Sequence, residues 1–101
     1  LASHSIECGE VVLNLNDTSA AVRGEKIDLT KNEFLILKTL MEKQGKVVSR
    51  EEIMERLWGN DEFVDDNTLT VNITRIRKKL EAAGVNDFIT TKRGLGYLVG
   101  A

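Results

Sequence analysis

Residues 66–80 place apolar and polar side chains with the period of an α-helix. The apolar positions are spaced by four, three and four residues, and they are Leu69, Ile73, Ile76 and Leu80. This spacing puts them on one side of a helix, which we expect to be buried. The polar residues of the segment are expected on the opposite, outward side, and they are Thr68, Asn72, Arg75 and Lys79, with Val71 beside them.

Capping motifs predict two more helices before this one. Thr30 and Glu33 have the spacing of a capping box, in which each side chain bonds the backbone N–H of the other residue, and Ser49 and Glu52 repeat it. Glycines mark where the three helices are expected to end, at Gln44–Gly45, Trp58–Gly59 and Gly84. Asp66 is the expected N-cap of the third helix.

Short apolar runs separated by polar turns predict strands on both sides of the helices. The N-terminal runs form an expected antiparallel meander and are Ile6–Cys8, Val11–Leu15, Ala20–Arg23 and Lys26–Leu29. Asn14 and Asp17 are turn-forming residues rather than a site. Val47 and Val48 suffice for a single strand pairing, and the glycines in Lys92–Gly96 predict a C-terminal hairpin.

This order of elements predicts an α+β fold. It is a winged helix-turn-helix with an N-terminal four-stranded antiparallel sheet, a three-helix core and a C-terminal β-hairpin wing. We expect one domain at residues 6–101, preceded by a linker at residues 1–5, because 101 residues are too few for two cores.

Composition excludes several classes of function. No apolar run approaches the roughly 20 residues that a membrane span requires, so no membrane partner is expected. Cys8 is the only cysteine, which rules out an internal disulfide and fits a cytoplasmic location. His4 and Cys8 lack the spacing of a metal site, and no glycine-rich phosphate loop precedes a helix. We therefore expect that the protein is not an enzyme and that it binds no metal ion or cofactor.

Charge is distributed unevenly along the chain. Residues 1–65 hold 13 acidic and 8 basic side chains, whereas residues 66–101 hold 3 acidic and 6 basic ones. Salt screens attraction to phosphate beyond about 10 Å, so a local basic surface matters more than the net charge of −2. The third helix and the hairpin are the candidate DNA interface.

The outward side of the third helix fits the major groove of DNA. Side chains of the types found there can pair with base edges, so the candidate base contacts are Thr68, Val71, Asn72 and Arg75. The alternative is a merely solvated amphipathic helix. Thr and Val have low helix propensity, so they do not stabilise an exposed helix. Their presence on the outward side therefore favours the interpretation that this side contacts a partner.

Basic residues beside that helix side and at the hairpin tip complete the candidate interface. Arg77 and Lys78 are assigned to phosphates, although they can also complement the helix dipole by about 0.3–1 kcal/mol. Lys92 and Arg93 at the hairpin tip are expected in a minor groove, with Thr91 on a phosphate. The alternative is a charged tip that deters edge pairing.

Four blocks of the chain resemble the effector domain of OmpR/PhoB-type response regulators. They are LTKNEFLILKTL (29–40), GKVVSREEIMERLWG (45–59), VDDNTLTVNITRIRKKL (64–80) and ITTKRGLGYLV (89–99). The resemblance implies a winged helix-turn-helix in bacterial two-component transcription factors, which bind tandem direct repeats in double-stranded DNA after phosphorylation of a receiver domain. No receiver lies in this chain.

The resemblance also implies roles for individual residues. The DNA-backbone contacts are assigned to Asn67, Thr74, Arg77, Lys78, Lys79, Thr91 and Trp58. For Trp58, core packing is the alternative. The resemblance implies that the loop between the second and third helices contacts RNA polymerase, and the candidate residues are Asn60, Asp61, Glu62 and Phe63. The alternative is that this loop is only a surface insertion.

Together these observations predict sequence-specific DNA binding by the output domain of a response regulator. The isolated domain is expected to be a monomer that binds weakly, and two copies are expected on repeated half-sites. The alternative is a winged helix that binds protein only.

Overall fold

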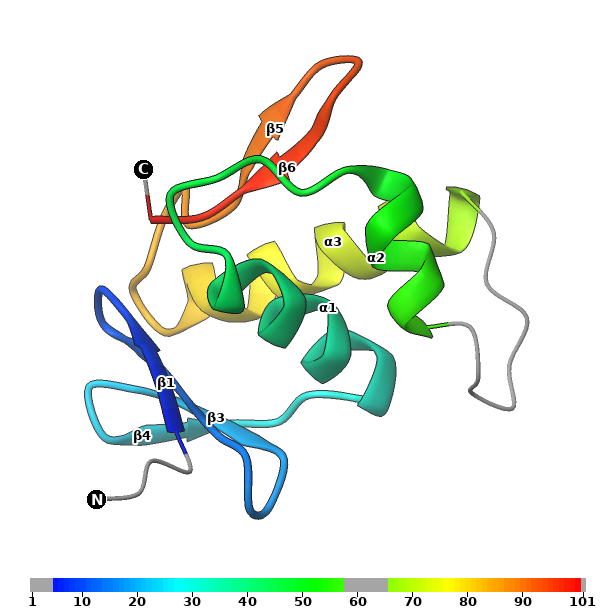
Figure 1. Cartoon of the computed structure of the whole chain (residues 1–101). Coiled ribbons are helices and arrows are strands. Elements are labelled where there is room, and N and C mark those ends of the chain that lie inside the picture. The colour runs from blue at the N-terminus through cyan, green and yellow to red at the C-terminus, as the bar shows by residue number, and fades with distance from the viewer. Residues whose placement is uncertain (1–4, 58–65, 101) are drawn as a thin grey trace.

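The N-terminal strands form an antiparallel sheet in chain order. The computed structural model describes residues 5–57 and 66–100 (Figure 1). The strands are β1 (Ser5–Cys8), β2 (Val11–Asn14), β3 (Ser19–Val22) and β4 (Glu25–Ile27), and each pairs with the next. The predicted meander is confirmed. β1 begins one residue earlier than expected, since Ser5 already pairs with Asn14, and β4 ends two residues earlier.

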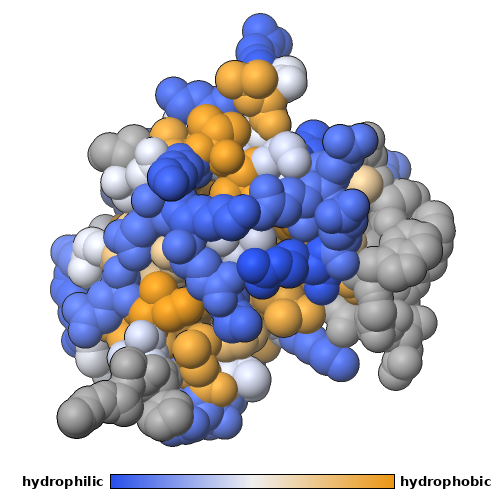
Figure 2. Space-filling view, in the orientation of Figure 1, coloured by the Kyte–Doolittle hydropathy of each residue, from blue (hydrophilic) through white to orange (hydrophobic). Residues whose placement is uncertain are grey.

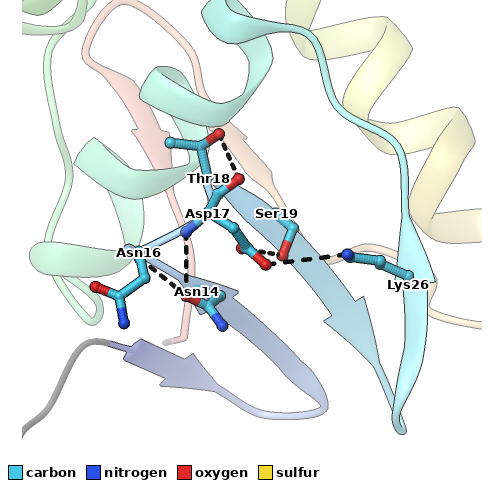
Figure 3. Close-up of polar contacts among 6 residues, drawn as sticks. All are labelled: Asn14, Asn16, Asp17, Thr18, Ser19 and Lys26. Atoms are coloured by element: carbon cyan, nitrogen blue, oxygen red, sulfur yellow. Dashed lines mark hydrogen bonds and ion pairs between the residues drawn. The ribbon is translucent and has the colours of Figure 1, made fainter.

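The turn between β2 and β3 is closed by its own side chains (Figure 3). Asn14 Oδ1 accepts from the backbone N of Asn16 at 2.9 Å, and Ser19 Oγ donates to Asp17 Oδ1 at 2.6 Å. Mainly because of that Ser19 hydrogen bond, the pKa of Asp17 lies below its usual value. These contacts confirm that Asn14 and Asp17 form a turn.

The first helix, α1 (Lys31–Glu42), begins at the predicted capping box. Thr30 Oγ1 accepts from the backbone N of Glu33 at 3.2 Å, and the backbone N of Thr30 donates to Glu33 Oε1 at 3.0 Å. The helix ends at Glu42 with Lys43 as its C-cap, so the predicted end at residues 44–45 is wrong. Gly45, at φ +86°, turns the chain after the helix instead, and its N–H donates to the carbonyl of Val99 at 2.7 Å.

The second and third helices are α2 (Arg50–Leu57) and α3 (Asp66–Ala82). Ser49 caps α2 as predicted, because its Oγ accepts from the backbone N of Glu52 at 3.1 Å. The Glu52 carboxylate pairs with Lys43 at the end of α1. α3 includes Asp66 as its first residue, so the prediction that Asp66 is the N-cap before the helix is wrong, and α3 ends two residues before Gly84.

The core lies between the sheet and the three helices of the described residues. The predicted apolar side of α3 is confirmed, since Leu69, Ile73, Ile76 and Leu80 are at most 1% exposed. They pack with equally buried residues of α1, α2 and the sheet, which include Leu37, Leu40, Ile53, Leu57 and Leu13. Burial of one side fixes which side of α3 is left for a partner.

The wing is a hairpin of β5 (Thr90–Lys92) and β6 (Gly96–Leu98), as predicted. It stands on the opposite side of the helices from the four-stranded sheet (Figure 1). Val48 and Tyr97 exchange two backbone hydrogen bonds of 2.8 and 2.9 Å, which confirms the single pairing expected near Val48. Gly96 permits this approach, because a Cβ there would lie 2.0 Å from the Val48 carbonyl oxygen.

Within residues 5–57 and 66–100, none of the helices has the length and hydrophobicity that a membrane crossing requires.

Candidate nucleic-acid interface

The outward side of α3 is offset from the predicted one. Up to Lys78, its exposed residues lie opposite the buried side and are Asn67, Thr70, Val71, Thr74, Arg75 and Lys78; Glu81 and Ala82 in the last turn are also exposed. Val71, at 44% exposure, is at the centre of this surface, with Arg75 one turn further along. The structure therefore leaves Val71 and Arg75 outward as expected and adds Thr70, which the sequence analysis missed.

Asn72 is buried, so its predicted outward placement is wrong. The residue is 5% exposed, and its Nδ2 donates to the Thr68 carbonyl oxygen at 2.8 Å. At 100° per residue, Asn72 lies only about 60° around the helix from Leu69, toward the buried side. Thr68 is half-buried on the same flank. The helical spacing already contained this signal, which a strict angular count would have found.

Lys79 is held by α1 and by the segment that precedes it, which contradicts its assignment to the DNA backbone. Its Nζ lies 2.5 Å from Glu33 Oε1 and 2.8 Å from the Asp28 carbonyl oxygen. Glu33 is only 1% exposed, so the ammonium group neutralises a buried carboxylate. Lys79 is a structural residue of the domain.

Arg77 is likewise bound within the protein rather than free for a phosphate. Its Nη2 donates to the Ile89 carbonyl oxygen at 3.0 Å and to Thr91 Oγ1 at 2.6 Å. These bonds join α3 to the first strand of the wing. Thr91 stays exposed, and its own hydroxyl proton is not used in the bond with Arg77.

Within the described residues, the exposed cations of α3 and the wing have no acidic partner. Arg75, Lys78, Lys92 and Arg93 form no side-chain hydrogen bond or ion pair with any residue of the described ranges. Several basic residues elsewhere are paired: Arg23 with Glu10 at 2.6 Å, and Arg56 with Glu42 at 3.2 Å. Positive charge without an ion-pair partner in the described residues therefore remains on the candidate interface, and such charge is what attracts phosphates.

The face shown in Figure 2 is mainly hydrophilic, with apolar side chains in separate small patches. Among the described residues the exposed large apolar side chains are Val47, Val71 and Leu95. A protein-only partner would be expected to need a larger continuous apolar surface.

Two observations on the described residues concern metal binding and thiol chemistry. They contain no group of three His, Cys, Asp or Glu side chains that could hold a metal ion. Cys8 is buried, and burial raises the pKa of its thiol, which disfavours the reactive thiolate. His4 and the candidate residues Trp58, Asn60, Asp61, Glu62 and Phe63 lie outside the described residues.

A core of three helices followed by a basic β-hairpin wing defines a winged-helix domain. The chain belongs to the family described as transcriptional regulatory protein, C terminal, which matches residues 24–99. This family comprises the DNA-binding domains of OmpR/PhoB-type response regulators, which regulate transcription and are not enzymes.

Individual relatives agree with this assignment. The sensory transduction protein BceR of Bacillus subtilis (strain 168) is 54% identical over 72 residues, which are 71% of this chain and 31% of BceR. The chain thus spans about a third of that relative's length. The C-terminal domain of the nisin resistance regulator NsrR is 39% identical, with a TM-score of 0.80 over 93% of this chain and 94% of that domain.

A further relative has been solved with DNA. The DNA-binding domain of RstA from Klebsiella pneumoniae, in complex with the RstA box, is 27% identical to this chain. It superposes with a TM-score of 0.80 over 97% of this chain and 98% of RstA's domain.

Proposed function

We propose that α3 enters the major groove of double-stranded DNA while the wing reaches the adjacent minor groove. The observation that carries this proposal is the set of exposed, unpaired cations: Arg75, Lys78, Lys92 and Arg93. They lie on α3 and the wing, and no acidic side chain of the described residues forms an ion pair with them. Phosphate neutralisation supplies most of the sequence-independent affinity for DNA.

The centre of the outward side of α3 would recognise the base sequence. Arg75 can donate two parallel hydrogen bonds to guanine, and Val71 can pack on a thymine methyl group. Asn67 lies one turn before Val71 and is exposed, so it can contact the backbone where the helix enters the groove. The Thr74 hydroxyl already donates to the Thr70 carbonyl oxygen at 3.1 Å, which leaves it able to accept but not to donate.

Lys78 and the wing supply the remaining contacts. Lys78 lies near the C-terminal end of α3, where an exposed ammonium group can reach a phosphate. Arg93 precedes Gly94 at the wing tip, and a narrow A·T-rich minor groove concentrates the negative potential that attracts such a guanidinium. Thr91 can donate to a phosphate while it accepts from Arg77.

For the intact protein we propose the output role in a two-component system. The chain spans 31% of BceR, so a receiver domain is proposed for the rest of the natural protein. Two copies on tandem direct repeats would gain affinity through effective concentration. Contact of residues 60–63 with RNA polymerase stays a prediction from the sequence.

Selection of bound sequences from a random duplex pool tests the DNA-binding proposal. A recovered motif should then be titrated with salt, where each neutralised phosphate contributes a slope of about −0.9 in log K against log salt concentration. Arg56→Ala is a matched control, because that cation pairs with Glu42 away from the interface. Failure to enrich any motif, or a flat salt dependence, would favour the protein-binding alternative.

A further inference from the structure

One arginine at the start of α2 joins the recognition helix to the wing. Arg50 Nη1 donates to Tyr97 Oη at 2.5 Å, and its Nη2 donates to Thr70 Oγ1 at 2.9 Å. The guanidinium carbon lies 5.6 Å from the centre of the Tyr97 ring, within the range of a cation–π contact. Tyr97 belongs to β6 of the wing and Thr70 to the outward side of α3.

The wing is anchored at its base by contacts of two kinds. The backbone of β6 forms hydrogen bonds with Val48, and Gly96 allows these two backbone segments to approach each other closely. Arg77 holds β5 from the other side through Ile89 and Thr91. Of these described contacts, only Arg50 connects the wing to the N-terminal half of α3, where Thr70 faces outward.

We propose that Arg50 is a positioning residue that fixes the distance between the recognition helix and the wing. It would thereby set which spacing between the major-groove bases and the minor-groove flank the domain accepts. This inference rests on the proposed DNA binding. An arginine suits the task because its planar guanidinium directs several donors at fixed angles, whereas lysine offers one flexible ammonium group.

The place of Arg50 also allows a direct contact with DNA, and the test must separate the two roles. The residue lines an open groove of about 350 Å³ between the start of α2 and the wing, together with Thr91, Lys92 and Arg93. A phosphate contact would depend on the charge of Arg50 alone. Positioning depends on its two acceptors as well.

Three variants remove the bridge while keeping shape or charge. Thr70→Val and Tyr97→Phe each delete one acceptor without changing the size of the side chain much, and Arg50→Lys keeps the charge but not the two-armed geometry. Binding is measured on the selected site and on sites with one base pair inserted or deleted between the core and the flank. We expect each variant to lose about 2- to 12-fold of the wild-type discrimination between these spacings, as for the loss of one typical hydrogen bond.

A measurement without DNA makes the test independent of the proposed function. Residual dipolar couplings of backbone N–H groups report the orientation of β5 and β6 relative to α3. We expect the three variants to show a changed or averaged wing orientation. Arg56→Lys, on the same helix but paired with Glu42, should match the wild type in both measurements.

These measurements distinguish a positioning role of Arg50 from a direct phosphate contact. Wild-type spacing discrimination and wing orientation in Thr70→Val and Tyr97→Phe would overturn the proposal. A salt slope reduced by about 0.9 in Arg50→Gln alone would then identify a phosphate contact instead. If the wild-type domain bound no duplex, the proposed function would fail, while the dipolar couplings would still decide the positioning role.

Discussion

Lys79 and Glu33 form an ion pair of 2.5 Å that joins α3 to the start of α1. Glu33 Oε1 also accepts from the backbone N of Thr30, so one carboxylate both closes the capping box of α1 and binds α3. Its other oxygen is buried without a hydrogen-bond partner among the described residues. The carboxylate therefore depends on Lys79 for its compensation, and the pair resists rotation of α3 about its axis.

The neighbouring lysines of α3 should therefore respond differently to substitution. Lys79→Ala leaves a buried carboxylate without its counter-ion and should cost about 2–4 kcal/mol of unfolding free energy, somewhat below the fully buried case because Lys79 is 35% exposed. Lys78→Ala should change stability by less than about 0.5 kcal/mol, because that exposed side chain has no partner in the described residues.

Chemical denaturation of both variants measures this difference, and a salt titration of DNA binding complements it. Lys78→Ala should reduce the salt slope by about 0.9, as the loss of one phosphate contact requires. Equal stability of the two variants would show that the Lys79–Glu33 pair contributes nothing to the fold.

Asn72→Ala should weaken the fold rather than change base preference. It removes the 2.8 Å hydrogen bond to the Thr68 carbonyl oxygen, which should cost about 0.5–1.5 kcal/mol. The 5% exposure of Asn72 leaves almost no surface for a base. Thermal unfolding and a selection from random duplexes check the two parts, and an altered motif with unchanged stability would mean that Asn72 reaches the DNA.

Arg75→Ala should lose discrimination at one or two base pairs, at a cost of about 1–3 kcal/mol in binding free energy. The reason is its exposed position one turn from Val71, without an internal partner in the part of the chain that the structure describes. Affinities for single-base variants of the selected site measure the effect. An unchanged profile across all positions would remove Arg75 from the base-reading role.

Arg93→Ala should weaken binding mainly on sites with A·T-rich flanks. The guanidinium at the wing tip gains most from a narrow minor groove, which A·T-rich DNA provides. Binding to matched duplexes with A·T-rich and G·C-rich flanks measures the difference. A loss of the same size on both flanks would indicate a phosphate contact instead of minor-groove insertion.

The sequence by itself determined the elements of this protein and their order. The capping box of Thr30 and Glu33 and the buried spacing of Leu69 and Ile73 depend on residues close together in the chain. Such short-range patterns carry their own geometry, because a helix fixes the relation between positions three and four apart. The burial of Asn72 also follows from helical spacing, because its position around the helix lies close to that of Leu69, although we predicted that it faces outward.

Only the tertiary structure decided which polar side chains remain free for a partner. Lys79 meets Glu33 across 46 residues, Arg77 meets Thr91 across 14, and Arg50 meets Tyr97 across 47. A cation looks the same in the sequence whether or not an acceptor lies beside it. Long-range packing of the helices and the wing brings these partners together, and that packing leaves Arg75, Lys78, Lys92 and Arg93 to face outward.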